Sequence, residues 1–231
     1  MVVPSMAAVL ASPGFWARDP DVGIDWRRFL HAEQEIIFHR PLFPEAVVYA
    51  KTRVDRIIDK GAGKGALIYL ERVIQDQEGD LATVRVVNFA RGNGGCGGDF
   101  GPQPPPHAIP DGRPERTFET HTDPRSALFY RLSGDPNPIH VDPDMAAAAG
   151  FDRPILHGLC SFGIATRAIL ASYCDYDPSR LRSIKLRFSK PVYPGETMRV
   201  DMWRIGDVIS FRATVADRGV VTLDHGRAEI G

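Results

Sequence analysis

The stretch GDPNPIH, residues 134–140, places three chemically useful side chains between and beside two prolines: Asp135, Asn137 and His140. An aspartate and a histidine that lie together can bind one water molecule, take its proton and return it elsewhere. Such proton transfer is worth roughly 10²–10⁴-fold in rate. Asn137 can orient that water or polarise a bound group. The residue types therefore indicate an acid/base site.

The two prolines restrict the shape of this stretch. Pro136 and Pro138 donate no backbone hydrogen bond, and each pushes the residue before it toward extended conformations. Fully extended, five residue steps would separate Asp135 from His140 by roughly 16 Å, so the chain must turn near Ile139 if the two cooperate. We predict a stiff, exposed loop edge. The alternative is an Asx-turn before a capped helix, with His140 an ordinary polar residue, and the spacing alone favours neither.

Gly158, in ILHGLCSFG, stands where an apolar helix is predicted to begin. The N–H groups and the positive end of a helix suit a carbonyl oxygen that becomes anionic, and glycine lets a ligand approach the backbone. The alternative is a glycine kept for tight packing. Cys160 and Ser161 are interpreted as packing residues, because their helix is very apolar and no G-x-S-x-G elbow is present.

Three helices are predicted around these residues. TDPRSALFYRL begins with a capping Thr or Asp and with Pro124 in the first turn. In DPDMAAAAG, Asp142 caps the helix, Pro143 opens it and Gly150 stops it. Residues 157–173 are apolar nearly all round, which is typical of a helix buried on most sides.

A repeat predicts the strands. FHRPLFPEAVVYAKTRVDRI begins at Phe38 and FSKPVYPGETMRVDMWRI begins at Phe188, and both then alternate apolar and polar residues as half-buried strands do. Further strand-like runs follow the first copy at 65–76 and 81–91, and the second copy at 207–217 and 220–230. Each half is predicted to be an antiparallel meander, the second one wrapped around the buried helix.

Composition suggests the domain boundaries. Residues 93–113 are rich in Gly and Pro and are predicted to be an irregular linker between an N-terminal unit, 1–92, and a C-terminal unit, 114–231, that carries the catalytic loop. GNGGCG, residues 92–97, formally matches a dinucleotide fingerprint. We reject that function because proline-rich sequence follows it where a helix is required.

The bulk properties exclude several classes of partner. A net charge of -1 over 231 residues gives no reason to expect nucleic acid or an anionic membrane. The N-terminal apolar run lacks a basic region and is too short to cross a bilayer. The widely spaced Cys96, Cys160 and Cys174 indicate a reducing compartment, and neither cysteines nor histidines show metal-binding spacing. We expect a cytoplasmic protein without a metal.

These motifs resemble the MaoC-like, R-specific enoyl-CoA hydratases of the hydratase 2 type. YRLSGDPNPIHVDP resembles the hydratase signature of that family, AGFDRPILHGLCSFG and RFSKPVYPGE resemble the segments after it, and LHAEQEI and DKGAGKG resemble two segments of its N-terminal half. The resemblance extends over nearly the whole chain. It implies an α+β double hot-dog fold, in which antiparallel sheets curl around a helix, and reversible hydration of a trans-2-enoyl-CoA to the (3R)-3-hydroxyacyl-CoA.

The resemblance also implies roles for individual residues. Asp135 and His140 would activate water, Asn137 would hold the site in register, and the N–H of Gly158 would bind the thioester oxygen. The acyl-CoA would be contacted by His31, Ala32, Lys60, Pro136, Pro138, Ile139 and Phe188. Coenzyme A arrives with the substrate, so neither a cofactor nor a metal is expected. A homodimer is expected because hot-dog units often pair through their sheets.

Two features depart from the family pattern. His31-Ala32-Glu33-Gln34 stands where the family usually has His-Gly-Glu-Gln, so a methyl group would crowd the approach of a ligand to the backbone. Family members also usually carry several dozen more residues before VPSMAAVLASPGFW, so the N-terminal unit is expected to be short of a strand and a helix. Two other functions stay open: a dehydratase or thioesterase acting on acyl carrier protein or another thioester, and a non-catalytic acyl-CoA-binding subunit.

Overall fold

The computed structural model describes residues 2–99 and 101–231, and the chain divides into two compact units, Met1–Pro106 and His107–Gly231. The division falls inside the Gly- and Pro-rich segment. Among the described residues of 91–115, the structure has no strand longer than an isolated bridge from Asp99 to Ile58. Across the two described ranges, no helix reaches the length and apolar character that crossing a membrane requires.

The first unit is a four-stranded antiparallel sheet in the order β2-β3-β4-β1. Its strands are β1 Phe29–Phe38, β2 Tyr49–Asp59, β3 Ala66–Asp76 and β4 Gly79–Ala90. Its helical elements, within the residues described, are the short 3-10 turns η1 Pro4–Ala8, η2 Trp16–Arg18, η3 Pro20–Val22 and η4 Trp26–Arg28. The predicted strands are confirmed, and so is the scarcity of helix in this half.

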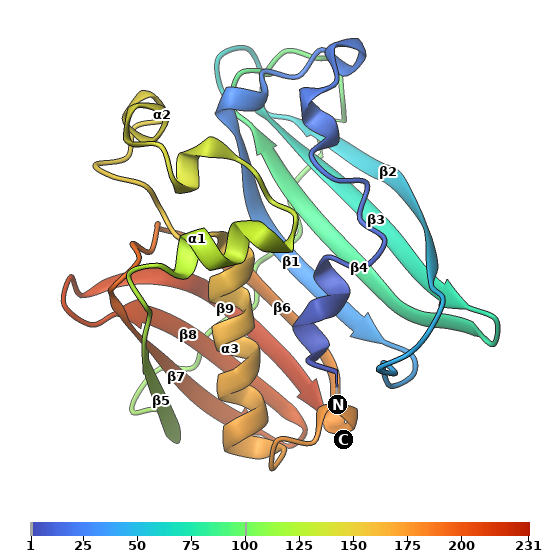
Figure 1. The fold of residues 1–231 in the computed structure, drawn as a ribbon, viewed down its shortest axis with the longest axis vertical. Coiled ribbons are helices and arrows are strands. Elements are labelled where there is room, and N and C mark those ends of the chain that lie inside the picture. Colours follow the sequence, from blue (N-terminus) through green and yellow to red (C-terminus); the bar gives the residue numbers. More distant parts are fainter. Residues whose placement is uncertain (1, 100) are drawn as a thin grey trace. The chain divides into compact units, whose positions relative to one another are not determined.

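The second unit is a five-stranded antiparallel sheet in the order β6-β9-β8-β7-β5. Its elements are β5 Arg116–His121, α1 Ser126–Tyr130, η5 Arg131–Ser133, η6 Pro138–His140, α2 Pro143–Ala148, α3 Gly158–Tyr173, η7 Pro178–Arg180, β6 Leu181–Phe188, β7 Thr197–Ile205, β8 Val208–Val215 and β9 Val220–Ile230. Helix α3 lies along the face of this sheet and contacts β5, β6 and β9 (Figure 1). This is the predicted hot-dog arrangement.

The two sheets have the same topology, which confirms the repeat. In chain order, the strands β1 to β4 form the spatial order β1-β4-β3-β2, and the strands β6 to β9 form the order β6-β9-β8-β7. Phe38 and Phe188, which begin the two sequence copies, are the last residues of β1 and β6. The second unit adds β5 and the helical segment that carries the candidate site.

The core of the second unit forms between α3 and the sheet. Phe162 and Ile169 of α3 are fully buried, as are Met198 and Phe211 on the strands. Each such side chain stabilises the fold by roughly 1.5–3 kcal/mol through removal of apolar surface from water. The core therefore fixes α3, and with it the position of the residues at the N-terminal end of the helix.

Two of the three predicted helices begin and end as expected, and one does not. The side chain of Asp142 accepts hydrogen bonds from the N–H groups of Asp144 and Met145 at the start of α2. The prediction that Pro124 opens the first helix was wrong, because α1 begins at Ser126. The carboxylate of Asp123 instead binds the backbone and guanidinium of Arg125, and this local turn occupies the residues that the cap would need.

The glycine-rich run GNGGCG is a packing loop. The carboxylate of Asp59 accepts hydrogen bonds from the N–H groups of Gly61, Gly95 and Gly97 at 2.8, 2.8 and 2.9 Å. A Cβ atom at Gly94 would overlap the carbonyl oxygen of Gly61. The glycines thus allow two backbone segments to meet around one carboxylate, which accounts for the run without a dinucleotide.

Candidate active site in the second unit

The stretch GDPNPIH folds back on itself through two successive turns. The N–H of Asn137 donates to the carboxylate of Asp135 at 3.1 Å, and the N–H of Ile139 donates to the side-chain oxygen of Asn137 at 3.3 Å. The 3-10 turn η6 then brings His140 back toward Asp135. The Asx-turns of the alternative interpretation are therefore present, and they bring Asp135 and His140 close together. The acid/base role of the two side chains stays a prediction.

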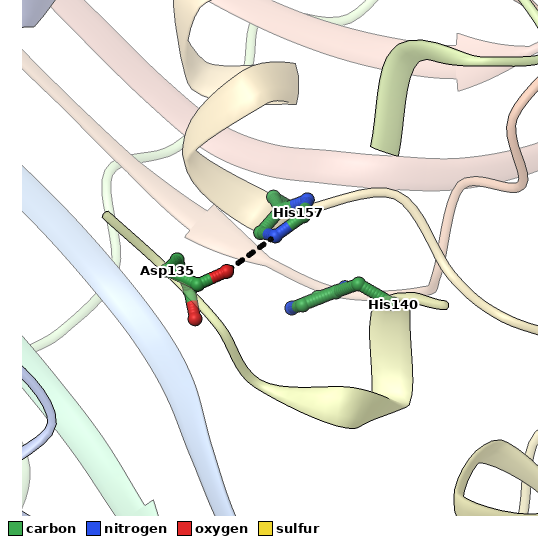
Figure 2. Close-up of side chains that lie close together, drawn as sticks. All are labelled: Asp135, His140 and His157. Atoms are coloured by element: carbon green, nitrogen blue, oxygen red, sulfur yellow. Dashed lines mark hydrogen bonds between the residues drawn. The ribbon is translucent and has the colours of Figure 1, made fainter. Parts of the chain in front are cut away.

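The polar atoms of Asp135, His140 and His157 lie close together (Figure 2). One carboxylate oxygen and one ring nitrogen from each histidine all lie within 4.8 Å of one another. Two acceptors bridged by a single water molecule lie roughly 4.6 Å apart. The spacing of these polar atoms therefore suits a shared water.

The expectation of an exposed loop edge was wrong at the far end of the loop. Pro136 is exposed, but His140 is only 7% exposed. The cause is the segment before α3, since the N–H of Ile155 donates to the carbonyl oxygen of Ile139 at 3.3 Å. The His140 ring then contacts the carbonyl oxygen of Ile155 and stacks on the ring of His157.

His140 is held in one tautomer by its partner. Its Nδ1 lies 2.8 Å from the carbonyl oxygen of Ile155, and a carbonyl can only accept, so Nδ1 carries the proton and Nε2 keeps a lone pair. Burial lowers the pKa of His140 below its ordinary value of 6.5, while the Ile155 carbonyl and Asp135 act in the opposite direction. His140 is therefore neutral at pH 7, and its Nε2 is an acceptor.

His157 is the site residue that sequence reasoning missed. It immediately precedes α3 and is 1% exposed, and its ring stacks on that of His140 with centroids 3.6 Å apart and planes 23° apart. Its Nε2 lies 3.4 Å from the backbone carbonyl oxygen of Asp135. The spacing of the two histidines along the chain gives no sign of this stack, because a helix and a turn lie between them.

Gly158 is closely packed, as one interpretation of the sequence predicts, and its role as an oxyanion donor stays a prediction. It is the first residue of α3, where a backbone N–H has no carbonyl within the helix to bond and the helix end is positive. A Cβ atom at this position would lie 3.2 Å from the ring of Phe188, the last residue of β6. The glycine therefore permits close packing and leaves a donor at the edge of the site.

The two nearby nucleophilic side chains are not placed for nucleophilic chemistry. Burial raises the pKa of the Cys160 thiol to about 11, so the reactive thiolate is scarce at pH 7. Ser161 is buried in α3. Their interpretation as packing residues agrees with this geometry.

Asp135, His140 and His157 are also the residue types that bind zinc. A zinc ion must lie near the plane of each imidazole, along the nitrogen lone pair. The two rings are stacked and only 23° from parallel, so their lone pairs run side by side and do not meet. One ring would have to leave the stack before both could bind one ion, and the arrangement fits water better than a metal.

Three of the predicted substrate contacts lie in the first unit. Ala32 is the extra residue of a β-bulge, since His31 pairs with Asn88 and Glu33 pairs with the next residue, Val87. Its methyl group packs against an apolar cluster in that sheet. Lys60 is exposed, with Nζ 5.3 Å from the centroid of the Phe89 ring. The remaining predicted contacts, Pro136, Pro138, Ile139 and Phe188, lie in the second unit around the acid/base loop.

Comparison with known proteins identifies the family of the chain. A family model described as "MaoC like domain" matches residues 105–225, and one described as "FAS1-like, dehydratase domain region" matches residues 1–85. The chain belongs to the MaoC-like dehydratase family. It is 41% identical over 218 residues to "Probable enoyl-CoA hydratase 2" of Dictyostelium discoideum, covering 90% of this chain and 74% of that protein.

Two further relatives show how much of each protein the chain covers. It is 33% identical over 234 residues to "Peroxisomal multifunctional enzyme type 2" of Mus musculus, covering 99% of this chain and 32% of that protein. The crystal structure of a MaoC-like dehydratase from Phytophthora capsici has a TM-score of 0.83 at 39% identity, covering 89% of this chain and 72% of that one. The chain thus matches a single part of the longer enzyme and most of the shorter ones.

Proposed function

We propose that the protein hydrates trans-2-enoyl-CoA reversibly to the (3R)-3-hydroxyacyl-CoA. One observation carries the proposal: the carboxylate of Asp135 and a ring nitrogen of His140 lie within 4.8 Å of each other, at the N-terminal end of a buried helix. The name of its Dictyostelium relative, an enoyl-CoA hydratase 2, supports hydration as the reaction and a coenzyme A thioester as the substrate. The roles of the individual site residues are part of the same proposal.

The reaction needs a base, an acid and an oxyanion donor. His140 Nε2 and the Asp135 carboxylate hold one water and take its proton as the water oxygen bonds to C3 of the substrate. The electrons of the C2–C3 double bond move toward the thioester oxygen, which accepts a hydrogen bond from the N–H of Gly158. The proton then passes to C2, so every atom of the water ends in the product.

In this scheme Asn137 does not touch the substrate and instead holds the backbone of the loop in place. Its side-chain oxygen is engaged by the N–H of Ile139, which keeps the turn closed and His140 facing Asp135. Pro136 and Pro138 keep the preceding residues out of helical conformations. The loop is thus preorganised before substrate arrives.

The expected substrate carries coenzyme A, and the scheme uses no metal or redox cofactor. His31, Ala32, Lys60 and Phe188 are proposed to contact the acyl-CoA. The bulge at Ala32 supports this in part, because a bulge redirects the backbone locally and is frequent beside binding sites.

The alternative of a dehydratase is close in chemistry. Dehydration of a 3-hydroxyacyl thioester is the same reaction run backward, and the Phytophthora relative is called a dehydratase. A carrier-protein thioester could replace coenzyme A without any change at Asp135 or His140. A thioesterase would direct a water molecule to the thioester carbon in place of C3, because Cys160 and Ser161 are unsuited as nucleophiles, and release of free thiol distinguishes it from a hydratase.

A spectrophotometric hydration assay tests the proposal. Crotonyl-CoA, decenoyl-CoA and the matching carrier-protein thioesters are compared for loss of the conjugated enoyl absorbance, with a thiol reagent present to detect thioester cleavage. The product is then resolved by chiral chromatography. We expect hydration to the (3R) product without thiol release. Tight acyl-CoA binding without turnover would overturn the proposal and favour a non-catalytic binding subunit.

We also propose that the protein is a cytoplasmic homodimer with no nucleic-acid or membrane partner. The widely spaced cysteines, which indicate a reducing compartment, support the cytoplasmic location. The frequent pairing of hot-dog units through their sheets supports the dimer. Its relatives include proteins named as peroxisomal, so localisation by fluorescent fusion decides the compartment. Sedimentation velocity decides the dimer, and a monomer at micromolar concentration would contradict it.

A further inference from the structure

We infer that His157 is a positioning residue for the proposed hydration: its ring fixes the plane of the His140 ring, and its Nε2 fixes the backbone of Asp135. The inference rests on the proposed function for its kinetic meaning. The geometry itself, however, is independent of any substrate. It assigns a role to a histidine that the acid/base scheme does not use.

His157 is rigidly mounted. Its carbonyl oxygen accepts hydrogen bonds from the N–H groups of Cys160 and Ser161 at 3.0 and 3.3 Å, so its backbone is part of the first turn of α3. Its ring lies against two others, with centroids 3.6 Å from that of His140 and 4.6 Å from that of Tyr130. A side chain held in this way can serve as a fixed surface for its neighbours.

His140 needs such a surface. A single hydrogen bond from Nδ1 to Ile155 fixes the tautomer of His140, but it leaves the ring free to rock about that bond. The flat face of His157 removes this freedom, so Nε2 of His140 keeps its direction toward Asp135 (Figure 2). Displacement of a reacting group by about 1 Å can cost roughly 10²-fold in rate, so this control of the ring matters.

The second contact fixes the other half of the pair. The Nε2 of His157 lies 3.4 Å from the carbonyl oxygen of Asp135, and a carbonyl accepts, so Nε2 carries the proton of the neutral ring. Nδ1 is then an acceptor, and it finds no hydrogen-bond partner among the described residues. A phenylalanine would fill the same space without burying an unsatisfied nitrogen, so the Nε2 contact is the reason we assign for a histidine here.

The charge state of His157 also suits the role. The groups that act on it are His140, Tyr130, Asp135 and Arg131. Burial first, and then the neighbouring His140, lowers the pKa of His157 to about 4, so the ring is neutral while His140 takes a proton from water. A neutral face stabilises the charged imidazolium beside it, whereas a second charge would repel it.

Three substitutions separate the two contacts. His157→Phe keeps the flat face and loses the Nε2 donor, His157→Gln keeps a donor and loses the ring, and His157→Ala loses both. We expect kcat for crotonyl-CoA hydration to fall about 10-fold in the first two and about 100-fold in the third, with KM within about threefold of wild type. His121→Ala is the matched control, because His121 is an exposed histidine of the same unit bound to Thr197.

A substrate-free measurement keeps the inference separate from the proposed function. In spectra of ¹⁵N-labelled imidazoles, both proteins should show His140 as the Nδ1–H tautomer that Ile155 selects, but the His140 ring signals should be sharp in wild type and broadened by ring motion in His157→Ala. If wild type proves inactive on every thioester, the proposed function falls and the spectra alone decide the inference. Values of kcat within twofold of wild type in both His157→Phe and His157→Gln, with unchanged His140 spectra, would overturn it. The assays are repeated at lower temperatures, well below the unfolding temperature of each variant. If the loss of kcat disappears there, the role of His157 is purely structural and the inference is also overturned.

Discussion

His140 donates its Nδ1–H to the carbonyl oxygen of Ile155, fifteen residues further along the chain, at 2.8 Å. This one bond decides which nitrogen of His140 carries the proton, and it leaves Nε2 as the base of the proposed mechanism. It also ties the loop that carries Asp135 to the segment that starts α3. The bond thus couples this loop to the segment before α3, and we expect a change in either to disturb the other.

Asp135→Asn and His140→Ala should each abolish most of the hydration activity. Either change removes one of the two groups that share the water proton, which is worth roughly 10²–10⁴-fold in kcat. Circular dichroism should stay unchanged for Asp135→Asn, because an asparagine side chain can still accept the N–H of Asn137. Initial rates with crotonyl-CoA measure the effect, and rates near wild type in either variant would contradict the mechanism.

The pH dependence of kcat/KM should have an acid limb below pH 6.5. His140 must be neutral to take a proton, and burial lowers its pKa from 6.5, so the base form persists into mildly acidic solution. Activity is therefore retained as the pH falls to 6.5 and is lost only below that. The profile is recorded with a thioester substrate that is stable across the range, and an acid limb above pH 7 would show that His140 is not the titrating base.

Gly158→Ala should lower kcat/KM by about 10-fold through displacement of the oxyanion donor. The added Cβ would lie 3.2 Å from the ring of Phe188, so either the ring or the helix end must shift. Phe188→Leu removes that ring edge and should restore part of the loss in the double variant. Phe188→Leu alone is the control, and a double variant no better than Gly158→Ala would show that crowding is not the cause.

Arg72→Met should destabilise the first unit. Arg72 is 6% exposed, and its guanidinium donates to the carbonyl oxygens of Ala7 and Ala8 at the end of η1, at 3.3 and 2.6 Å. Loss of hydrogen bonds from a charged group costs roughly 1.5–3 kcal/mol in the free energy of unfolding. Urea unfolding measures it. Arg53→Met is the control, because Arg53 is exposed and its ion pair with Glu71 is worth at most about 1 kcal/mol.

Asp59→Asn should lower the melting temperature at neutral pH, and the difference from wild type should shrink in acid. The N–H groups of Gly95, Gly61 and Gly97 lower the pKa of Asp59 below 3.8 in the folded state. The stabilisation by the ionised carboxylate is therefore complete above pH 3.8 and is lost as the pH falls through the lower folded value. Calorimetry from pH 7 down to pH 3 measures it, and a difference that grows in acid would contradict this account.

Much of the fold could be predicted because it depends on local patterns. Period-2 alternation marked the strands of both units, and the equal topology of the two sheets followed from the repeated segments at Phe38 and Phe188. The start of α2 was predictable since Asp142 caps it through bonds to its own neighbours. The start of α1 was not predictable, because Asp123 binds Arg125 instead of capping a helix. A helix cap and this local turn would involve the same residues, so the sequence does not distinguish them.

In the candidate site, too, the short-range interactions could be predicted and the tertiary contacts could not. The sequence by itself determined which groups are available, and it offered the Asx-turns that close the loop as one of two interpretations, because those interactions span only two residues each. Only the tertiary structure decided that His157 stacks on His140, that Ile155 selects the tautomer and that Phe188 packs on Gly158. These contacts join residues 15 to 30 positions apart through the packing of α3 on the sheet, and no local pattern encodes where a buried helix comes to rest.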